Sequence, residues 1–574
     1  MHLRVFAAVF MGVAKFGSAQ NCPIAGPAYP AVTNVAASEA LQAARTVFDQ
    51  ALAQTLADGV IDSNTTAFSI QVYSTHADNV LYQYHHPGPP FAANKTVGPD
   101  TLYRIGSVSK AIAVYAILAA LSFKYWNEPI TKYVPELDNL PLRSAVDDVN
   151  WDEVTLGALA SHMAGIGNDY AVGDVPTGIS GLPSIDGSAY PRCGTAQLRP
   201  CTRAESLQLM VAKPPVTPTY YSPTYSNMAF QLLAYAVENI TGQSFSSLVH
   251  DSVISPLNLT RTFLSPPLND TDAVVVDGFA RDLGDAAPAG GYLQSPADLT
   301  ALGKSILTSS LLPKSTTRQW LRPVTHSAFA LHAVGAPWEI ERVPVPVSPN
   351  PNTTTTRLLD VYTKSGGIAG YASLLALIPD HDIGITLLVA DGTPARATAT
   401  FTALLTLLAG TWLPAGEHAA RAQAEISLAG KYTSPGDSGG SSFAEFTLLP
   451  NTPGLFLSRL STNGTDILTT LLTSSPDGGP TSNTPFGAWL YPTGLKMQSS
   501  HDHNDGTYTK RLAFRAVLGR ADVPASDATC RGVGVIDALR YGPYAVDQFV
   551  FRVDGGGRAI GVEVPVLQEV LVRT

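Results

Sequence analysis

The sequence predicts two domains, a large mixed α/β or α+β domain followed by a smaller domain that is mostly β. Between about residues 38 and 412, helical patterns alternate with short β-rich runs, such as the run at 67–73, the helix at 110–123 and the run at 383–389. After Pro414, nearly every segment looks like a strand bounded by turns. The chain has 574 residues, of which 45% are hydrophobic and 14% charged, so it can bury a large core.

The large domain is expected to span residues 20–415 and to contain one insertion. Residues 169–203 are rich in Gly, Pro and Ser and interrupt the regular patterns, which indicates an inserted surface loop. Residues 415–426 are predicted to be either a helix or a linker. The β-rich domain is then expected at residues 425–574.

Two segments carry the strand prediction for the second domain. Residues 511–516 alternate with the period of two that is typical of a half-buried strand. Phe549, Phe551 and Val553 are followed by the turn sequence Asp-Gly-Gly-Gly at 554–557 and by a second alternating run at 560–564. This pattern predicts a β-hairpin.

The N-terminus is typical of a secretory signal peptide at residues 1–19. An apolar run from Val5 to Ala14 is followed by the small residues of 17–19, where signal peptidase prefers them. The alternative is a buried first helix. We expect a secreted protein whose mature chain begins near Gln20.

The remaining sequence predicts a freely soluble protein without a membrane anchor. The most apolar helical run, residues 111–121, is too short to cross a bilayer, and the C-terminus lacks the apolar tail of a lipid-anchored precursor. A formal net charge of -10 without a basic patch argues against nucleic acid as a partner. The oligomeric state is left open.

Sequons and cysteines agree with export. Asn-x-Ser/Thr sequons, which predict glycosylation, occur at Asn64, Asn94, Asn239, Asn258, Asn269, Asn352 and Asn463. The four cysteines form an even set, as expected in an oxidising compartment. Our preferred pairing joins Cys193 to Cys201 and Cys22 to Cys530, while the other two pairings stay open. No metal-binding spacing accompanies these cysteines.

Two serines compete for the role of nucleophile. Ser438 lies in SPGDSGGSSF, which contains the letters that surround the nucleophile of trypsin-like proteases. However, the surrounding Gly, Ser and Pro residues are explained by a turn or linker, and no upstream histidine and aspartate suit a protease. His162, for example, lies in a helical pattern. We therefore disfavour Ser438.

Ser107 is the stronger candidate because Lys110 follows it three residues later at the start of a helical run. This spacing places both side chains on one face at the helix N-terminus. The free amides there favour a developing negative charge, and a partly buried Lys110 can accept the proton of Ser107. By itself the spacing is more typical of an N-cap serine followed by a solvated lysine.

Two later motifs favour the chemical interpretation. Tyr225 and Asn227 precede another helix, and Lys364-Ser365-Gly366-Gly367 precedes two strand-like runs. Together with Ser107 and Lys110, they resemble the S-x-x-K, Y-x-N and K-[ST]-G motifs of the serine beta-lactamase and penicillin-binding-protein superfamily. The tyrosine of the second motif resembles the class C and D-alanyl-D-alanine-carboxypeptidase branch, which includes esterases. Class A resembles it less, because Glu136 comes before the second motif instead of after it.

Further blocks extend the resemblance over roughly residues 40–412. They are residues 154–166, 238–262 and 289–299, in the order of the family. The resemblance implies an α+β catalytic domain with an antiparallel sheet flanked by helices. The sequence AGKY at 429–432 resembles the β-rich extension that many of these hydrolases carry.

The resemblance also implies residue roles. Ser107 would be the nucleophile, Lys110 and Tyr225 would share the proton transfers, and the backbone amides of Ser107 and Gly367 would form the oxyanion hole. Asn227 would hold the substrate amide or Lys110. Lys364, Ser365 and Gly366 would line the cleft, where the first two could bind a substrate carboxylate. No metal or cofactor is required, so we interpret His501 to Asp505 as a solvated turn.

The expected function is a secreted, fungal-type serine hydrolase that forms an acyl-enzyme at Ser107 on small esters, amides or lactams. A transesterase that passes the acyl group to another alcohol is an alternative, and so is a catalytically silent binding protein. Esterase or amidase activity is favoured over beta-lactamase activity. The insertion at 169–203 is expected to shape specificity.

Overall fold

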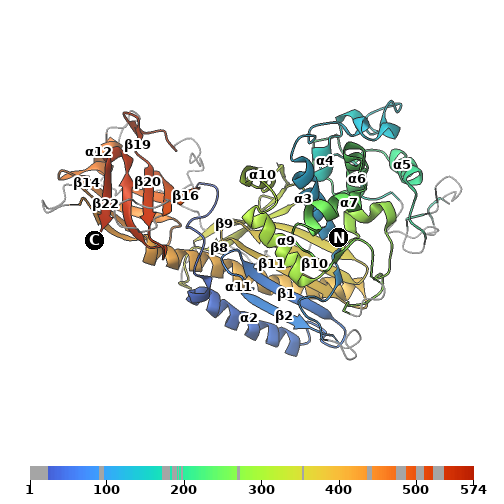
Figure 1. The fold of residues 1–574 in the computed structure, drawn as a ribbon, viewed down its shortest axis with the longest axis horizontal. Helices are drawn as coiled ribbons and strands as arrows, with labels where there is room; N and C mark the ends of the chain where they lie inside the picture. Colours follow the sequence, from blue (N-terminus) through green and yellow to red (C-terminus); the bar gives the residue numbers. More distant parts are fainter. Residues whose placement is uncertain are drawn as a thin grey trace.

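The computed structural model shows a large α+β body joined to a β-barrel (Figure 1). The residues that it describes are 24–574 except 89–95, 171–180, 184–190, 192, 195–197, 268–271, 352–354, 436–441, 474–485, 499–509 and 521–535. The signal peptide at 1–19, Cys22, Cys530, Ser438 and the 501–505 cluster therefore lie outside the described residues. The same holds for the sequons Asn94, Asn269 and Asn352.

An antiparallel sheet forms the centre of the large body, as the resemblance implied. Its described strands follow the order β2-β1-β11-β10-β9-β8-β7-β6. They are β1 (Ala67–Ser74), β2 (Tyr82–His86), β6 (Thr325–His326), β7 (His332–Val334), β8 (Glu339–Pro346), β9 (Thr356–Ile368), β10 (Tyr371–Ile378) and β11 (Ile383–Ala390). A small second sheet pairs β5 (Leu293–Gln294) with β3 (Tyr103–Arg104) and β4 (Thr262–Phe263).

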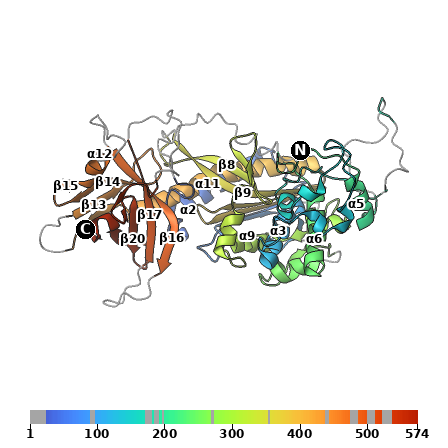
Figure 2. The ribbon, with the colours of Figure 1, turned by 90° about the horizontal axis from the view of Figure 1, so that it is seen from above.

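Helices cover both faces of the sheet, which explains why its central strands are buried throughout (Figures 1 and 2). In β10, Leu374 and Ala376 pack with helices α2 (Glu39–Ala57) and α11 (Pro394–Ser427). The alternate residues Leu375 and Leu377 pack in a separate core on the other face. The helices of that core include α3 (Ser109–Leu121), α4 (Leu156–Ala160), α6 (Met228–Thr241), α7 (Phe245–Val249), α8 (Ala287–Gly290), α9 (Pro296–Thr308) and α10 (Lys314–Trp320).

Helix α11 extends for 34 residues and continues through Pro414. The segment at 415–426 is thus a helix, the first of the two possibilities that the sequence left open. Proline in a helix interior costs about 3 kcal/mol, so packing must outweigh this loss. Trp412 and Leu413, directly before Pro414, are buried in the core that the sheet and α2 form, and Ala415, directly after it, is buried in the same core. Among the described helices, α11 alone is long and apolar enough to cross a membrane, and 56% of its most apolar window is buried inside the fold.

The C-terminal domain is an eight-stranded barrel, because β13 pairs with β14 and closes the sheet order β13-β12-β22-β21-β20-β17-β16-β14. The hairpin predicted near 554–557 is present between β20 and β21. The described strands are β12 (Gly430–Thr433), β13 (Ser442–Thr447), β14 (Leu455–Thr462), β15 (Thr465–Asp466), β16 (Phe486–Gln498), β17 (Lys510–Arg520), β18 (Arg540–Tyr541), β19 (Tyr544–Ala545), β20 (Gln548–Val553), β21 (Ala559–Val564) and β22 (Glu569–Arg573), with one helix, α12 (Ile467–Thr473).

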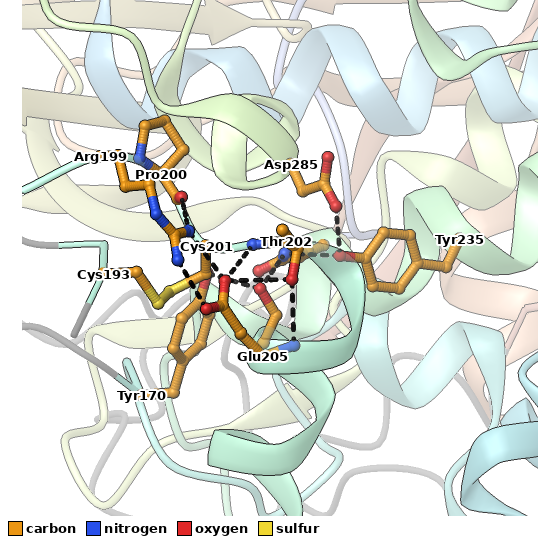
Figure 3. The surroundings of a disulfide bond; sticks show 11 residues. Tyr170, Cys193, Arg199, Pro200, Cys201, Thr202, Glu205, Tyr235 and Asp285 are labelled. Atoms are coloured by element: carbon orange, nitrogen blue, oxygen red, sulfur yellow. Dashed lines mark hydrogen bonds and ion pairs between the residues drawn. A yellow bond between two sulfur atoms is a disulfide. The ribbon is translucent and has the colours of Figure 1, made fainter. Parts of the chain in front are cut away.

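The expected insertion contains a disulfide beside helix α5 (Arg203–Val211) (Figure 3). Cys193 and Cys201 are bonded, with their Cα atoms 4.9 Å apart, so the preferred pairing of these two is correct. Thr202 then caps α5 in a capping box with Glu205, and Arg199 pairs with the same carboxylate. The disulfide therefore ties the described end of the insertion to the start of a helix.

The described sequons lie on the surface. Asn64, Asn239, Asn258 and Asn463 are exposed, which agrees with the expectation that sequons occupy surface positions. Glu136 also lies on the surface, where its carboxylate pairs with Arg203.

Candidate active site

Ser107 lies where a short strand passes into helix α3. Strand β3 ends at Arg104, and the 3₁₀ turn η3 (Gly106–Val108) leads directly into the helix. Ile105, before the turn, donates its N–H to Tyr292 and accepts a hydrogen bond from Ser373 Oγ at 2.6 Å. These bonds hold the turn against the sheet, so Ser107 is presented on a fixed backbone.

Two glycines allow strand β9 to approach this turn. Gly106 has φ +47°, and a Cβ atom there would lie 2.8 Å from the backbone N of Gly367. A Cβ atom on Gly366 would lie 2.1 Å from the carbonyl oxygen of Ile105 and 2.9 Å from the backbone N of Ser107. Only residues without a side chain permit such contact. The backbone amides assigned to the oxyanion hole, those of Ser107 and Gly367, thus belong to two segments in direct contact.

Lys110 is fully buried and its ammonium group has three oxygen neighbours. Nζ lies 3.0 Å from Ser107 Oγ, 2.7 Å from Asn227 Oδ1 and 2.6 Å from the carbonyl oxygen of Ala289. Burial lowers the pKa of Lys110, and the positive charge of Lys364 lowers it further. In the neutral amine, two N–H groups can serve Asn227 and Ala289 while the lone pair faces Ser107.

Asn227 is held with its carbonyl oxygen toward Lys110. Its Nδ2 group donates to Asn168 Oδ1 at 3.1 Å and to both carboxylate oxygens of Asp169, at 3.2 and 3.0 Å. Because carboxylate oxygens only accept, they fix which end of the amide faces Lys110. Asp169 is the first residue of the insertion, which therefore reaches the site.

Tyr225 lies beside both lysines. The Nζ atoms of Lys110 and Lys364 are 4.9 and 5.3 Å from the centre of its ring. Burial works to raise the pKa of Tyr225, but the positive charges of the two lysines outweigh burial and lower the pKa. At a given pH, Tyr225 is therefore ionised to a greater extent than a free phenol, and the phenolate form is the one that can accept a proton.

His162 packs against Tyr225 with ring centres 4.4 Å apart. Helix α4 ends before His162, which has φ +60°, so the predicted helical position was wrong by two residues. Its Nδ1 accepts the backbone N–H of Ser226 at 3.1 Å. Burial and the two nearby lysines hold the pKa of His162 well below its usual value, so the ring is neutral. His162 therefore positions the backbone next to Tyr225.

Lys364 and Ser365 both bind Glu339, the first residue of strand β8. Lys364 Nζ forms a short ion pair with Glu339 Oε1 and also donates to the carbonyl oxygen of Ser365 at 2.8 Å. Ser365 donates its Oγ–H and its N–H to Glu339 Oε2, at 2.8 and 3.0 Å. Burial works to lower the pKa of Lys364, but Glu339 and Tyr225 outweigh burial and raise it. Lys364 is thus a permanent cation.

The structure brings together every residue that the three motifs supplied, from η3, α3, β9 and the loop before α6. Sequence reasoning missed Glu339, Asp169 and the positioning role of His162. Asp169 is the first residue of the irregular segment, and no local sequence pattern marks Glu339. Among the described residues, no group of three or more His, Cys, Asp or Glu side chains is arranged to hold a metal ion.

Comparisons with known proteins agree with this geometry. A family model described as "Beta-lactamase" matches residues 48–408, and one described as "Beta-lactamase-like-like, C-terminal domain" matches 420–574. The chain is 31% identical to a "Beta-lactamase-like protein" of Arthroderma benhamiae, over 97% of this chain and 96% of that protein.

Two other relatives have names that describe an activity. The "Probable hydrolase M10" of Phoma sp. is 25% identical over 87% of this chain and 83% of its own length. "Esterase EstB" of Burkholderia gladioli is 27% identical over 37% of this chain and 48% of its own length. From the extent of the family match and the site geometry, we conclude that the chain belongs to the beta-lactamase family and carries the C-terminal domain found in beta-lactamase-like proteins.

Proposed function

We propose that the protein is a serine hydrolase that forms an acyl-enzyme at Ser107 on small ester or amide substrates. One observation carries the proposal. The buried Lys110 amine lies beside Ser107 Oγ, and its other two hydrogen-bond partners are Asn227 Oδ1 and the carbonyl oxygen of Ala289. A lysine whose pKa is lowered in this way can accept the serine proton as Ser107 attacks a carbonyl carbon.

The remaining steps use the neighbouring groups. The backbone N–H groups of Ser107 and Gly367 would stabilise the negative oxygen of the tetrahedral intermediate. Lys110 and Tyr225 would then pass the proton to the leaving group. In the second half of the reaction, Tyr225 would take a proton from the water that releases the acyl group, helped by the two lysines that lower its pKa.

Esters and amides are favoured over lactams as substrates. The relatives named as a probable hydrolase and as an esterase support this choice. A beta-lactam remains the second candidate, because the family name rests on that reaction. All three substrate classes would acylate Ser107: an ester or amide releases its alcohol or amine, whereas the amine of an opened lactam stays attached to the acyl group.

We also propose that the protein is secreted and N-glycosylated. The exposed sequons at Asn64, Asn239, Asn258 and Asn463 support glycosylation. The Cys193–Cys201 disulfide supports folding in an oxidising compartment. Expression in a fungal host, followed by intact mass before and after glycan removal, tests both claims. An intracellular protein of unmodified mass would contradict them.

Intact mass and peptide mapping after exposure to a p-nitrophenyl ester, and separately to a penicillin, test the proposed reaction. The expected result is acylation of Ser107 in the wild type and in Ser438→Ala, but not in Ser107→Ala. Loss of the nucleophile should reduce turnover by about 10³-fold or more. Absence of any adduct on Ser107 in folded protein would contradict the proposal, and a long-lived penicillin adduct beside rapid ester turnover would favour the esterase.

A further inference from the structure

Lys364 and Ser365, which the resemblance assigned to a substrate carboxylate, bind the carboxylate of Glu339 instead. Glu339 accepts hydrogen bonds from Lys364 Nζ, from the hydroxyl of Ser365 and from the backbone N–H of Ser365. Its side chain is 16% exposed and that of Lys364 is 1% exposed. The position is therefore filled by an internal, almost fully enclosed ion pair.

Because they already donate to Glu339, Lys364 and Ser365 have few N–H or O–H groups left for a second anion. The Ser365 hydroxyl has a single hydrogen, and it points to Glu339. Lys364 has three N–H groups, of which one serves Glu339 and one serves the carbonyl oxygen of Ser365. A carboxylate that arrived here would meet Glu339 as a like charge in a site that is poorly screened.

The charges around the cleft add to this effect. Asp169 is a second carboxylate at the site, where it binds Asn227. The pKa of Lys110 is lowered and its reactive form is neutral, so Lys364 is the permanent cation next to Ser107. A substrate anion would therefore meet the carboxylates of Glu339 and Asp169 close to the groups that it needs.

We propose that Glu339 is a specificity-determining residue that excludes substrates with a carboxylate beside the scissile bond and selects uncharged esters and amides. This proposal rests on the proposed function and names its substrate class. Displacement of Glu339 by a substrate would remove three hydrogen bonds from an almost fully enclosed carboxylate, which opposes exchange.

A matched pair of substrates tests the proposal. 3-Acetoxybenzamide and 3-acetoxybenzoate have nearly the same shape and transfer the same acetyl group to Ser107, but only the second carries a carboxylate. Deacylation is common to both, so a difference in kcat/KM reports acylation alone. After correction for the alkaline hydrolysis rates of the free compounds, we expect the wild-type kcat/KM for 3-acetoxybenzamide to exceed that for 3-acetoxybenzoate by about tenfold or more.

Glu339→Gln keeps the size of the side chain and removes its charge. In this variant we expect the ratio of kcat/KM for 3-acetoxybenzamide to kcat/KM for 3-acetoxybenzoate to fall close to one, because Lys364 is then free to attract the benzoate. Glu341→Gln is the matched control: Glu341 lies two residues further along β8 and contacts neither Lys364 nor Ser365 in the described structure. Burial raises the pKa of Glu341 to about 8, so at pH 7 glutamine replaces a carboxyl that is already neutral, and the wild-type preference should remain.

The outcomes separate the two proposals. If neither compound acetylates Ser107, the proposed function fails and this inference fails with it. If both acetylate Ser107 without a preference, or if folded Glu339→Gln keeps the wild-type preference, only the inference fails. Should Glu339→Gln not fold, the wild type still decides with methyl 3-acetoxybenzoate, which is uncharged and larger than the benzoate. Exclusion by charge predicts that its acetyl group is transferred as readily as that of the amide, whereas exclusion by shape predicts that it is rejected like the benzoate.

Discussion

Asn227 Oδ1 lies 2.7 Å from Lys110 Nζ, and the opposite end of the same amide is bound by Asp169. The amide thus connects helix α3, which carries Lys110, to the first residue of the insertion. One N–H group of Lys110 donates to the amide oxygen, so the orientation of the amide helps to set the direction of the Lys110 lone pair. Asn227 is therefore placed to orient Lys110, the proposed proton acceptor.

Replacement of Asn227 by leucine should slow acylation by about 10²-fold, because the Lys110 amine loses one of the two acceptors that direct its lone pair at Ser107. Pre-steady-state release of p-nitrophenol measures this step. Asp169→Asn keeps a hydrogen-bond acceptor near Asn227 and should have a smaller effect. Wild-type acylation in a folded Asn227→Leu protein would show that Ala289 alone suffices to orient Lys110.

The pH dependence of kcat/KM should report Lys110. Activity should rise as pH rises through the pKa of Lys110, because only the neutral amine accepts the Ser107 proton. Burial and then the charge of Lys364 lower that pKa, so removal of the charge in Lys364→Met should raise it and move the rising limb to higher pH. Lys364→Arg retains the charge and should keep the limb near its wild-type position. A limb that stays in place in Lys364→Met would mean that burial alone sets the pKa of Lys110.

Alanine at Gly366 should disrupt the oxyanion hole. Its Cβ would lie 2.1 Å from the carbonyl oxygen of Ile105 and 2.5 Å from Ser373 Oγ, so β9 and η3 must separate. We expect a loss of about 10²-fold or more in kcat and a cost in stability of about 1–3 kcal/mol. Gly410→Ala is the matched control, since its Cβ would meet no atom within 4 Å on helix α11. That variant should retain activity and gain up to about 1 kcal/mol in unfolding free energy.

Sequence patterns located the three motifs that meet at the candidate site but not the groups that set their charges. The Ser107–Lys110 spacing is local to one helix turn, so helical periodicity is enough to place both side chains on one face. Glu339 reaches Lys364 because β8 pairs with β9, with Glu339 opposite Thr363. That register is long-range information, and the 338–341 sequence shows only an alternating strand.

The continuation of α11 through Pro414 was similarly decided by tertiary contacts. Proline predicts a break because it lacks an N–H and its ring crowds the preceding turn. In the structure, the turn that follows Pro414 carries Glu417, whose side chain is fully buried. Local propensity cannot include such a contact, since its partner Arg357 is on strand β9.

Glu417 should make the protein sensitive to acid. Its carboxylate accepts from Arg357 Nε at 2.8 Å and lies 3.3 Å from His381 Nε2, while Arg357 also binds Asp380. Burial works to raise the pKa of Glu417, but Arg357 and His381 outweigh burial and lower the pKa to about 2. The ion pair thus favours the charged carboxylate in the folded state more than water does in the unfolded state.

The sign of the pH effect follows from this lowered pKa. The stabilising contribution is complete above the ordinary pKa of about 4.5 and is lost as pH falls from about 4.5 to about 2, by an amount on the order of 3 kcal/mol. Glu417→Gln should cost about 3 kcal/mol at pH 7, because Arg357 loses a buried partner, and should flatten the decline in acid. Urea unfolding at pH 7, 4.5 and 3 measures both effects. Glu425→Gln, an exposed position on the same helix, should match the wild type at each pH. An acid decline in Glu417→Gln as steep as that of the wild type would assign the acid sensitivity to other carboxylates.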